Sequence, residues 1–155
     1  MSSTFPSPRR LGFVGAVPVD MDATRDVIDK YVHVPAQGEG TNVEVVLDHV
    51  LESLQETTRQ IQLIEVIPNA NITVNVGNYF TLSVIDRGSN GQGDTVLATL
   101  AFSAGGPYDA WVPFTLPLVA SAAGPSPNDV LTLQITHAGS GQVVPDLAVR
   151  IRYKN

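Results

Sequence analysis

The chain has 155 residues with a formal net charge of −6, a charged fraction of 15% and no cysteine. This length predicts one domain with a substantial core. The basic residues are thinly spread, which excludes a nucleic-acid-binding surface. The lack of cysteine excludes a disulfide framework, a thiolate metal site and a cysteine nucleophile. No apolar run is long enough to span a membrane and the N-terminus has no secretory h-region, so we expect a soluble protein used without export, whose charge-poor surface suits burial against a partner.

Residues 1–24 are predicted to form an extended N-terminal arm ahead of a single β-domain at 25–155. Three prolines and two glycines in this stretch oppose a helix or a central strand. Its apolar side chains are too many for an idle tail, so we expect the arm to lie on a partner. The arm residues expected to make contact are Phe5, Arg9, Arg10, Leu11 and Phe13.

The next two segments differ in how clearly they are patterned. Residues 25–35 alternate at their end and predict a short strand that stops at Pro35. Residues 43–56 place six apolar side chains at helical spacing, and Thr41 with Glu44 fits a capping box. The β-branched valines of this stretch favour a strand instead. We predict a short helix over 43–56, because the six apolar positions fit one stripe.

From Gln60 onward, short apolar runs recur at regular intervals between glycine-rich turns. We predict strands at 61–68, 72–76, 79–85, 94–102 and 110–118. The last of these carries Pro113 and Pro117 on its outward face, which predicts an edge strand.

The closing stretch has the clearest pattern. Residues 131–136 and 147–153 both alternate apolar and polar side chains, and the turn Gly139–Gly141 follows the first of them. We predict that they form an antiparallel pair with one face in the core. The fold class is therefore mainly β: an antiparallel β-sandwich, jelly-roll-like, with one short helix and the N-terminal arm.

Chemistry-bearing motifs are weak. In the loop 86–94, Asp86, Asn90 and Asp94 resemble an EF-hand loop, but Gly88 replaces one ligand and Leu97 stands where the closing glutamate belongs. We predict a flexible connecting loop. The three histidines lie in unrelated segments, and no nucleophile elbow or phosphate-binding loop occurs. We predict no catalytic centre, no metal and no cofactor, and hence a protein that is not an enzyme.

Two surface features could bind a partner. The cluster Tyr108, Asp109 and Trp111 has the aromatic and polar groups of a carbohydrate site, although packing of the two rings under the loop or against a sister subunit explains it better. Arg150, Arg152 and Lys154 line one strand face. They could pair with an acidic partner, or they could be solvated edge charges that discourage aggregation.

Residues 61–153 carry a set of strand and turn motifs. The chain has Pro-x-Ala-x-Ile-Thr at Pro68–Thr73, Asn-Tyr-x-Thr-Leu at Asn78–Leu82, Asp-Val-Leu-Thr-Leu at Asp129–Leu133, then an Ala-Gly-Ser-Gly turn and Pro145. In these motifs the chain resembles the decoration, or cement, proteins of tailed-phage heads.

The resemblance implies a β-sandwich that trimerises on the outside of an icosahedral shell, at its three-fold and quasi-three-fold positions, and clamps neighbouring subunits with an extended arm. The expected partners are the major capsid protein and sister copies, and the expected location is the outer surface of the virion, after synthesis in the host cytoplasm. The residues expected to contact capsid or sister subunits are Phe5, Arg9, Arg10, Leu11, Phe13, Trp111, Arg150 and Arg152. The alternative is a carbohydrate- or receptor-binding module of a virion surface.

Overall fold

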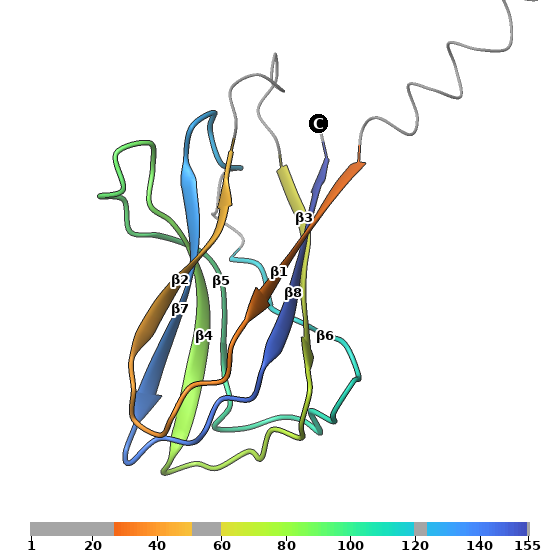
Figure 1. Cartoon of the computed structure of the whole chain (residues 1–155), viewed down its shortest axis with the longest axis vertical. Helices are drawn as coiled ribbons and strands as arrows, with labels where there is room; N and C mark the ends of the chain where they lie inside the picture. Colours follow the sequence, from red (N-terminus) through yellow and green to blue (C-terminus); the bar gives the residue numbers. More distant parts are fainter. Residues whose placement is uncertain (1–26, 51–59, 120–123, 155) are drawn as a thin grey trace, which may run out of the picture.

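A computed structural model describes residues 27–50, 60–119 and 124–154, and all regular structure in these ranges is β (Figure 1). The eight strands are β1 (Val27–Val34), β2 (Val43–His49), β3 (Gln60–Pro68), β4 (Tyr79–Asp86), β5 (Thr95–Ala101), β6 (Phe114–Thr115), β7 (Val130–Ala138) and β8 (Leu147–Lys154). Within the described residues there is no helix of the length and apolarity that crossing a membrane requires.

The strands form two antiparallel sheets that face each other. One sheet has the order β1-β8-β3-β6 and the other β2-β7-β4-β5. In β8 the side chains of Val149 and Ile151 are fully buried, and in β7 those of Leu133 and Ile135 are as well. Alternation therefore turns one side of each sheet into a shared apolar core, because successive side chains of a strand point to opposite faces. The predicted antiparallel β-sandwich is confirmed.

The predicted pairing of the two closing strands is wrong. β7 lies between β2 and β4, whereas β8 lies in the other sheet between β1 and β3. The connection at 139–146 is longer than the two to five residues typical of a hairpin. It crosses between the sheets, anchored by the buried Val144 and its backbone bridge to Gln37. Each strand does turn its apolar face to the core, so the pattern was informative about burial and not about the partner strand.

The predicted helix over 43–56 is wrong in the part of this segment that the structure describes. Val43–His49 is strand β2, paired with β7, and residues 51–56 lie outside the described ranges. The register of this pair shifts between Val46 and Asp48. Such a bulge adds one residue to the strand and interrupts strict alternation. The apolar positions on either side of it then fall at a spacing that resembles a helical stripe.

The other strand predictions have mixed outcomes. The segments at 25–35, 61–68, 79–85 and 94–102 match β1, β3, β4 and β5 to within two residues at each end. The segment 72–76 makes only one bridge, between Ile72 and Tyr108, and 110–118 contains only the two-residue β6. That short strand pairs with β3 at the end of its sheet, as the edge position predicted. Of its predicted inward row only Leu116 is fully buried, and Val112 and Leu118 are exposed.

Candidate functional site

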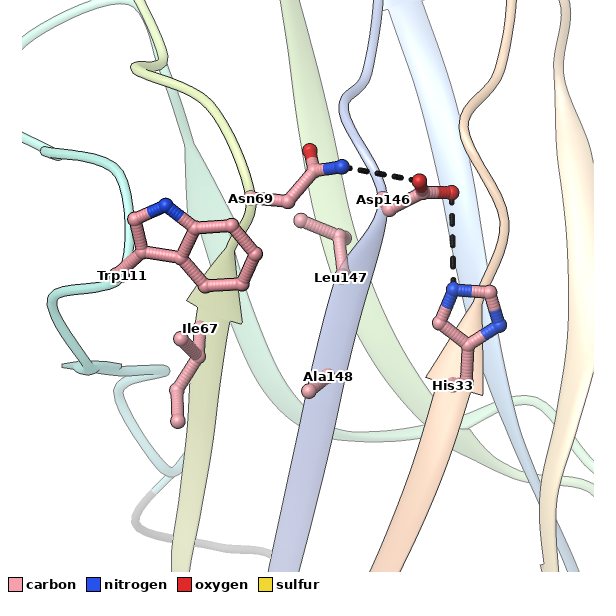
Figure 2. Close-up of a pocket in the computed structure, with 7 residues that line it drawn as sticks. All are labelled: His33, Ile67, Asn69, Trp111, Asp146, Leu147 and Ala148. Carbon is pink, nitrogen blue, oxygen red and sulfur yellow. Dashed lines mark hydrogen bonds and ion pairs between the residues drawn. The ribbon is translucent and has the colours of Figure 1, made fainter.

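The outward face of sheet β1-β8-β3-β6 holds a shallow groove at the end where β3 stops and β8 begins (Figure 2). Trp111, from the loop between β5 and β6, forms one wall of it and is 72% exposed. Its lining residues are His33, Ile67, Asn69, Trp111, Asp146, Leu147 and Ala148. The only tryptophan of the chain is thus displayed on the surface beside aliphatic side chains.

The backbone holds Trp111 in place. Its φ is +65°, in the left-handed region that non-glycine residues rarely adopt. The Trp111 N–H donates to the Pro68 carbonyl at 2.8 Å, and the preceding Ala110 N–H donates to Asn71 Oδ1 at 2.8 Å. A strained conformation persists only where the surrounding structure determines it. The backbone of the loop is therefore fixed to the end of β3 at Trp111, and the indole is exposed beside the groove.

Tyr108 does not join Trp111 in the groove. Its ring packs edge-on against Phe102, with centroids 4.8 Å apart, and against Phe114 at 5.0 Å. Tyr108 therefore belongs to the aromatic cluster at the rim of the core, in line with the predicted packing under the loop. The proposed carbohydrate cluster of Tyr108, Asp109 and Trp111 thus loses one of its two aromatic rings as a surface group.

The polar rim of the groove is built around Asp146. One carboxylate oxygen accepts the Ala36 N–H at 2.7 Å and lies 3.6 Å from His33 Nε2, and the other accepts Asn69 Nδ2 at 3.0 Å. These contacts tie together the end of β1, the end of β3 and the start of β8 (Figure 2). Both oxygens are already used within the chain, so the surface that the groove offers to a ligand is chiefly apolar.

The two candidate arginines of β8 are paired within the same sheet. Arg150 Nη2 lies 2.5 Å from Glu65 of β3, directly opposite it in register. Arg152 donates to both carboxylate oxygens of Asp29 in β1, at 2.8 and 3.0 Å. These hydrogen bonds hold the pKa of Asp29 below its usual value and raise the pKa of Arg152. The centre of the face is thus neutralised pair by pair, while a role of either arginine in partner binding stays a prediction.

On the other sheet, the residues of the EF-hand-like loop do not converge. Asp86 accepts the Gly88 N–H at 2.8 Å, Asn90 accepts the Gln92 N–H at 3.0 Å, and Asp94 pairs with Arg87. Among the described residues there is no group of three or more His, Asp or Glu side chains that could hold a metal ion. Each candidate ligand instead stabilises the turn that it belongs to.

Asp86 yields a stability prediction. Burial, together with the charge of nearby Asp129, raises the pKa of Asp86 above its usual value. A raised pKa in the folded state means that this group stabilises the fold below its unfolded pKa and loses that contribution as the pH rises. We therefore expect Asp86→Asn, which keeps an acceptor for the Gly88 N–H, to raise the Tm at pH 7 by a few degrees. Calorimetric scans should show the gain vanish near pH 3, and a variant less stable than wild type at pH 7 would contradict it.

The five arm residues predicted to make contacts lie outside the described residues, so their contacts stay predictions. From the sequence, Trp111 was a candidate contact residue, but packing of its ring under the loop or against a sister subunit was favoured; at 72% exposed, the ring does not pack under the loop. The rest of the groove was missed, because residues 33, 69 and 146 meet only through the strand order β1-β8-β3. No local motif in the sequence signals that neighbourhood.

No protein-family model matches the chain, and no curated protein matches it. Among solved structures, one similar chain comes from the structure of infectious bursal disease virus, Gt strain, with a TM-score of 0.31 and 14% identity. The alignment covers 83% of this chain and 37% of the viral chain. At such a TM-score we draw nothing from the likeness, and the groove and its face have to be judged from their own geometry.

Proposed function

We propose that this protein is a structural component of a virion, a non-enzymatic decoration protein that binds the outer surface of a tailed-phage head. In this proposal, the outward face of sheet β1-β8-β3-β6 is buried against the major capsid protein. The observation that supports it best is the exposed Trp111, on a loop whose backbone is hydrogen-bonded to the end of β3, beside Ile67 and Ala148. The motifs that resemble decoration proteins, at 61–153, supply the identity of the partner.

The residue types on the outward face of sheet β1-β8-β3-β6 are those of a protein–protein interface. Tryptophan, tyrosine and arginine are enriched in protein interfaces, and anchoring side chains tend to be rigid and central. Here Trp111 and Tyr31 are exposed, while the arginines are already paired with carboxylates of their own sheet. Burial of such a face leaves neither arginine unpaired, which removes the largest cost of covering it.

A repetitive shell would also suit a binding face with a single anchoring tryptophan. One anchoring tryptophan gives modest affinity, but copies that bind several capsid subunits at once gain avidity. A protein that binds the assembled shell and not the free subunits stabilises the shell by mass action. The trimer expected from the resemblance, and contacts made by the N-terminal arm, are further parts of this proposal.

The carbohydrate-binding alternative has less support. A sugar site needs free polar groups beside the stacking ring, whereas both oxygens of Asp146 are used by Ala36, His33 and Asn69. Tyr108 is occupied by the aromatic cluster. Binding of the full chain to a glycan array, lost in Trp111→Ala, would nevertheless favour this function over the proposed one.

The genes that adjoin this one provide the first test, and we expect a major capsid gene among them. Shells assembled from that capsid protein then serve as the target in sedimentation assays. Trp111→Ala should raise the Kd for shells about 30-fold or more, as loss of an interface anchor does. Val46→Ala, which removes another exposed side chain from the opposite sheet, is the matched control and should bind as wild type does. Failure of the wild type to sediment with shells would reject the proposal.

A further inference from the structure

The groove beside Trp111 opens at one end of the sandwich, where the loops after β1, β3, β5 and β7 meet (the lower end in Figure 1). Backbone hydrogen bonds join these four loops to one another. The pairs that join them are Gln37 with Val144, Asn69 with Asp146, and Ile72 with Tyr108. The loops therefore form one continuous surface around the groove.

The carboxylates of this end have no Lys or Arg beside them. The four loops carry Glu39, Asp109 and Asp146, and they contain no Lys or Arg. On the strands, by contrast, acidic side chains face a basic partner of their own sheet or of the facing one. Those pairs are Asp29 with Arg152, Glu44 with Arg87, Asp48 with Lys30, and Glu65 with Arg150. The groove end is therefore negative, and it would attract an occupant that carries positive charge.

The chain itself contains a segment that fits a groove with an apolar floor and an acidic surround. Residues 5–13 read Phe-Pro-Ser-Pro-Arg-Arg-Leu-Gly-Phe, so two adjacent arginines stand between apolar side chains. Arg9 and Arg10 are the only basic residues of the arm, residues 1–24, and the arm has no acidic residue before Asp20. Phe5, Leu11 and Phe13 could cover the exposed indole, while the arginines face the uncompensated carboxylates.

The connection to the domain is long enough for this contact. The groove lies at the opposite end of β1 from Val27, which is about 26 Å along the strand, and about 10 Å across β8 to β3. The chain from Phe13 to Val27 can span up to about 46 Å when extended. Residues 5–13 can therefore reach the groove of their own chain.

We propose that, in the free protein, residues 5–13 bind in the Trp111 groove of their own chain. The apolar side chains of the segment lie against Trp111 and Ile67, and its arginines face Asp109 and Asp146. The side chain of Asp146 is 41% exposed, so it stays accessible although it accepts hydrogen bonds within the chain. Asp109 is exposed and has no ion pair among the described residues.

The tether makes even a weak contact effective. A segment linked to the domain has an effective concentration in the millimolar range. A Kd of about 100 µM for the free segment would then keep the groove occupied for about nine-tenths of the time. A shallow groove with one aromatic wall is therefore sufficient.

The contact would regulate the groove without fixing the oligomeric state. It concerns the free protein, so it holds or fails independently of shell binding and is compatible with the expected trimer. If the capsid protein uses the same groove, as proposed above, the arm and the capsid are alternative occupants. The arm then shields the exposed tryptophan until the shell displaces it, and its release frees it for the capsid contacts expected of it.

Acrylamide quenching of the single tryptophan measures the contact, because this neutral quencher reports the exposure of the indole. In the full-length protein, Arg9→Glu/Arg10→Glu should be quenched several-fold more strongly than wild type, with unchanged circular dichroism. Asp109→Arg should have the same effect, and the three substitutions combined should restore much of the protection. Lys154→Glu, which reverses an exposed cation at the far end of β8, is the matched control and should behave as wild type. Equal quenching of wild type and Arg9→Glu/Arg10→Glu would overturn the proposal.

A disulfide test identifies the chain that supplies the segment. The protein has no cysteine, and Ala148 is an exposed residue of the groove. A disulfide forms only where the two Cα atoms come within about 7 Å. Mild oxidation of full-length Leu11→Cys/Ala148→Cys should therefore give an intrachain disulfide, seen as a single chain of altered mobility on a non-reducing denaturing gel.

The matched control places the second thiol on the opposite sheet. Leu11→Cys/Val46→Cys, at another exposed position, should stay reduced under the same conditions. Disulfide-linked dimers or trimers of Leu11→Cys/Ala148→Cys would show that the segment of a sister copy fills the groove. Absence of any cross-link in that variant would show that the segment binds elsewhere, and either result would overturn the proposal.

Discussion

Replacing Phe102 with alanine is expected to lower the free energy of unfolding by about 3–5 kcal/mol. Phe102 is fully buried, and its ring lies 4.5 Å from that of Phe80 and 5.6 Å from that of Phe114. The loss combines the hydrophobic transfer of the ring, the cavity left behind and the broken edge-on aromatic contacts. Because domains of this size are stable by only about 5–15 kcal/mol, much of the margin would be lost.

The effect should reach the groove as well. Tyr108 packs on Phe102, and the Tyr108 carbonyl accepts the Ile72 N–H at 2.9 Å, so the loop that carries Trp111 rests on this ring. Urea titration gives the free energy of unfolding, and the fluorescence anisotropy of the single tryptophan should fall if the loop loosens. Val143→Ala, at an exposed position, is the control and should change stability by less than about 0.5 kcal/mol. A loss below about 1 kcal/mol in Phe102→Ala would contradict the expected role of this ring.

Burial was predictable from the sequence to a greater extent than pairing. Alternation in 131–136 and 147–153 identified two strands and their buried faces, because period-two burial is a local property. It did not reveal that β7 and β8 belong to different sheets, since hydrogen-bonded neighbours come from distant parts of the chain. β2 shows the opposite limit. There a bulge, which depends on the partner strand, interrupts the alternation, so the apolar positions of the strand fall at helical spacing.

The candidate site was predictable only in part, for the same reason. Residue type and strand alternation singled out Trp111 and the row containing Arg150 and Arg152. Their surroundings depend on the strand order: Glu65 and Asp29 meet these arginines only because β8 lies between β3 and β1. A charged row that suggests an external partner in the sequence is therefore largely satisfied inside the sheet, and the apolar groove beside Trp111 remains as the better candidate contact.

Glu44 is the residue for which we expect the largest effect among the polar side chains. It accepts two hydrogen bonds from Arg87, at 2.6 and 2.8 Å, and a third from the Thr132 hydroxyl at 2.6 Å. Thr132 is nearly buried, so Glu44→Ala leaves a buried hydroxyl without this partner. Hydrogen bonds to charged groups contribute about 1.5–3 kcal/mol each in protected sites. The partial exposure of Glu44 reduces this, and we expect a total loss of about 1–2 kcal/mol at pH 7.

The pH dependence of that loss identifies the charge as its origin. The hydrogen bonds from Arg87, and then that from Thr132, hold the pKa of Glu44 below its usual value. A lowered pKa means that the carboxylate stabilises the fold above its unfolded pKa, about 4.3, and that this contribution is lost as the pH falls through the folded pKa. Urea midpoints of wild type and Glu44→Ala should therefore differ clearly at pH 7 and differ less at pH 3. Glu39→Ala, in the exposed loop after β1, should match wild type at both pH values. An equal gap between wild type and Glu44→Ala at both pH values would show that packing, and not the ion pair with Arg87, holds β2 to its sheet at this point.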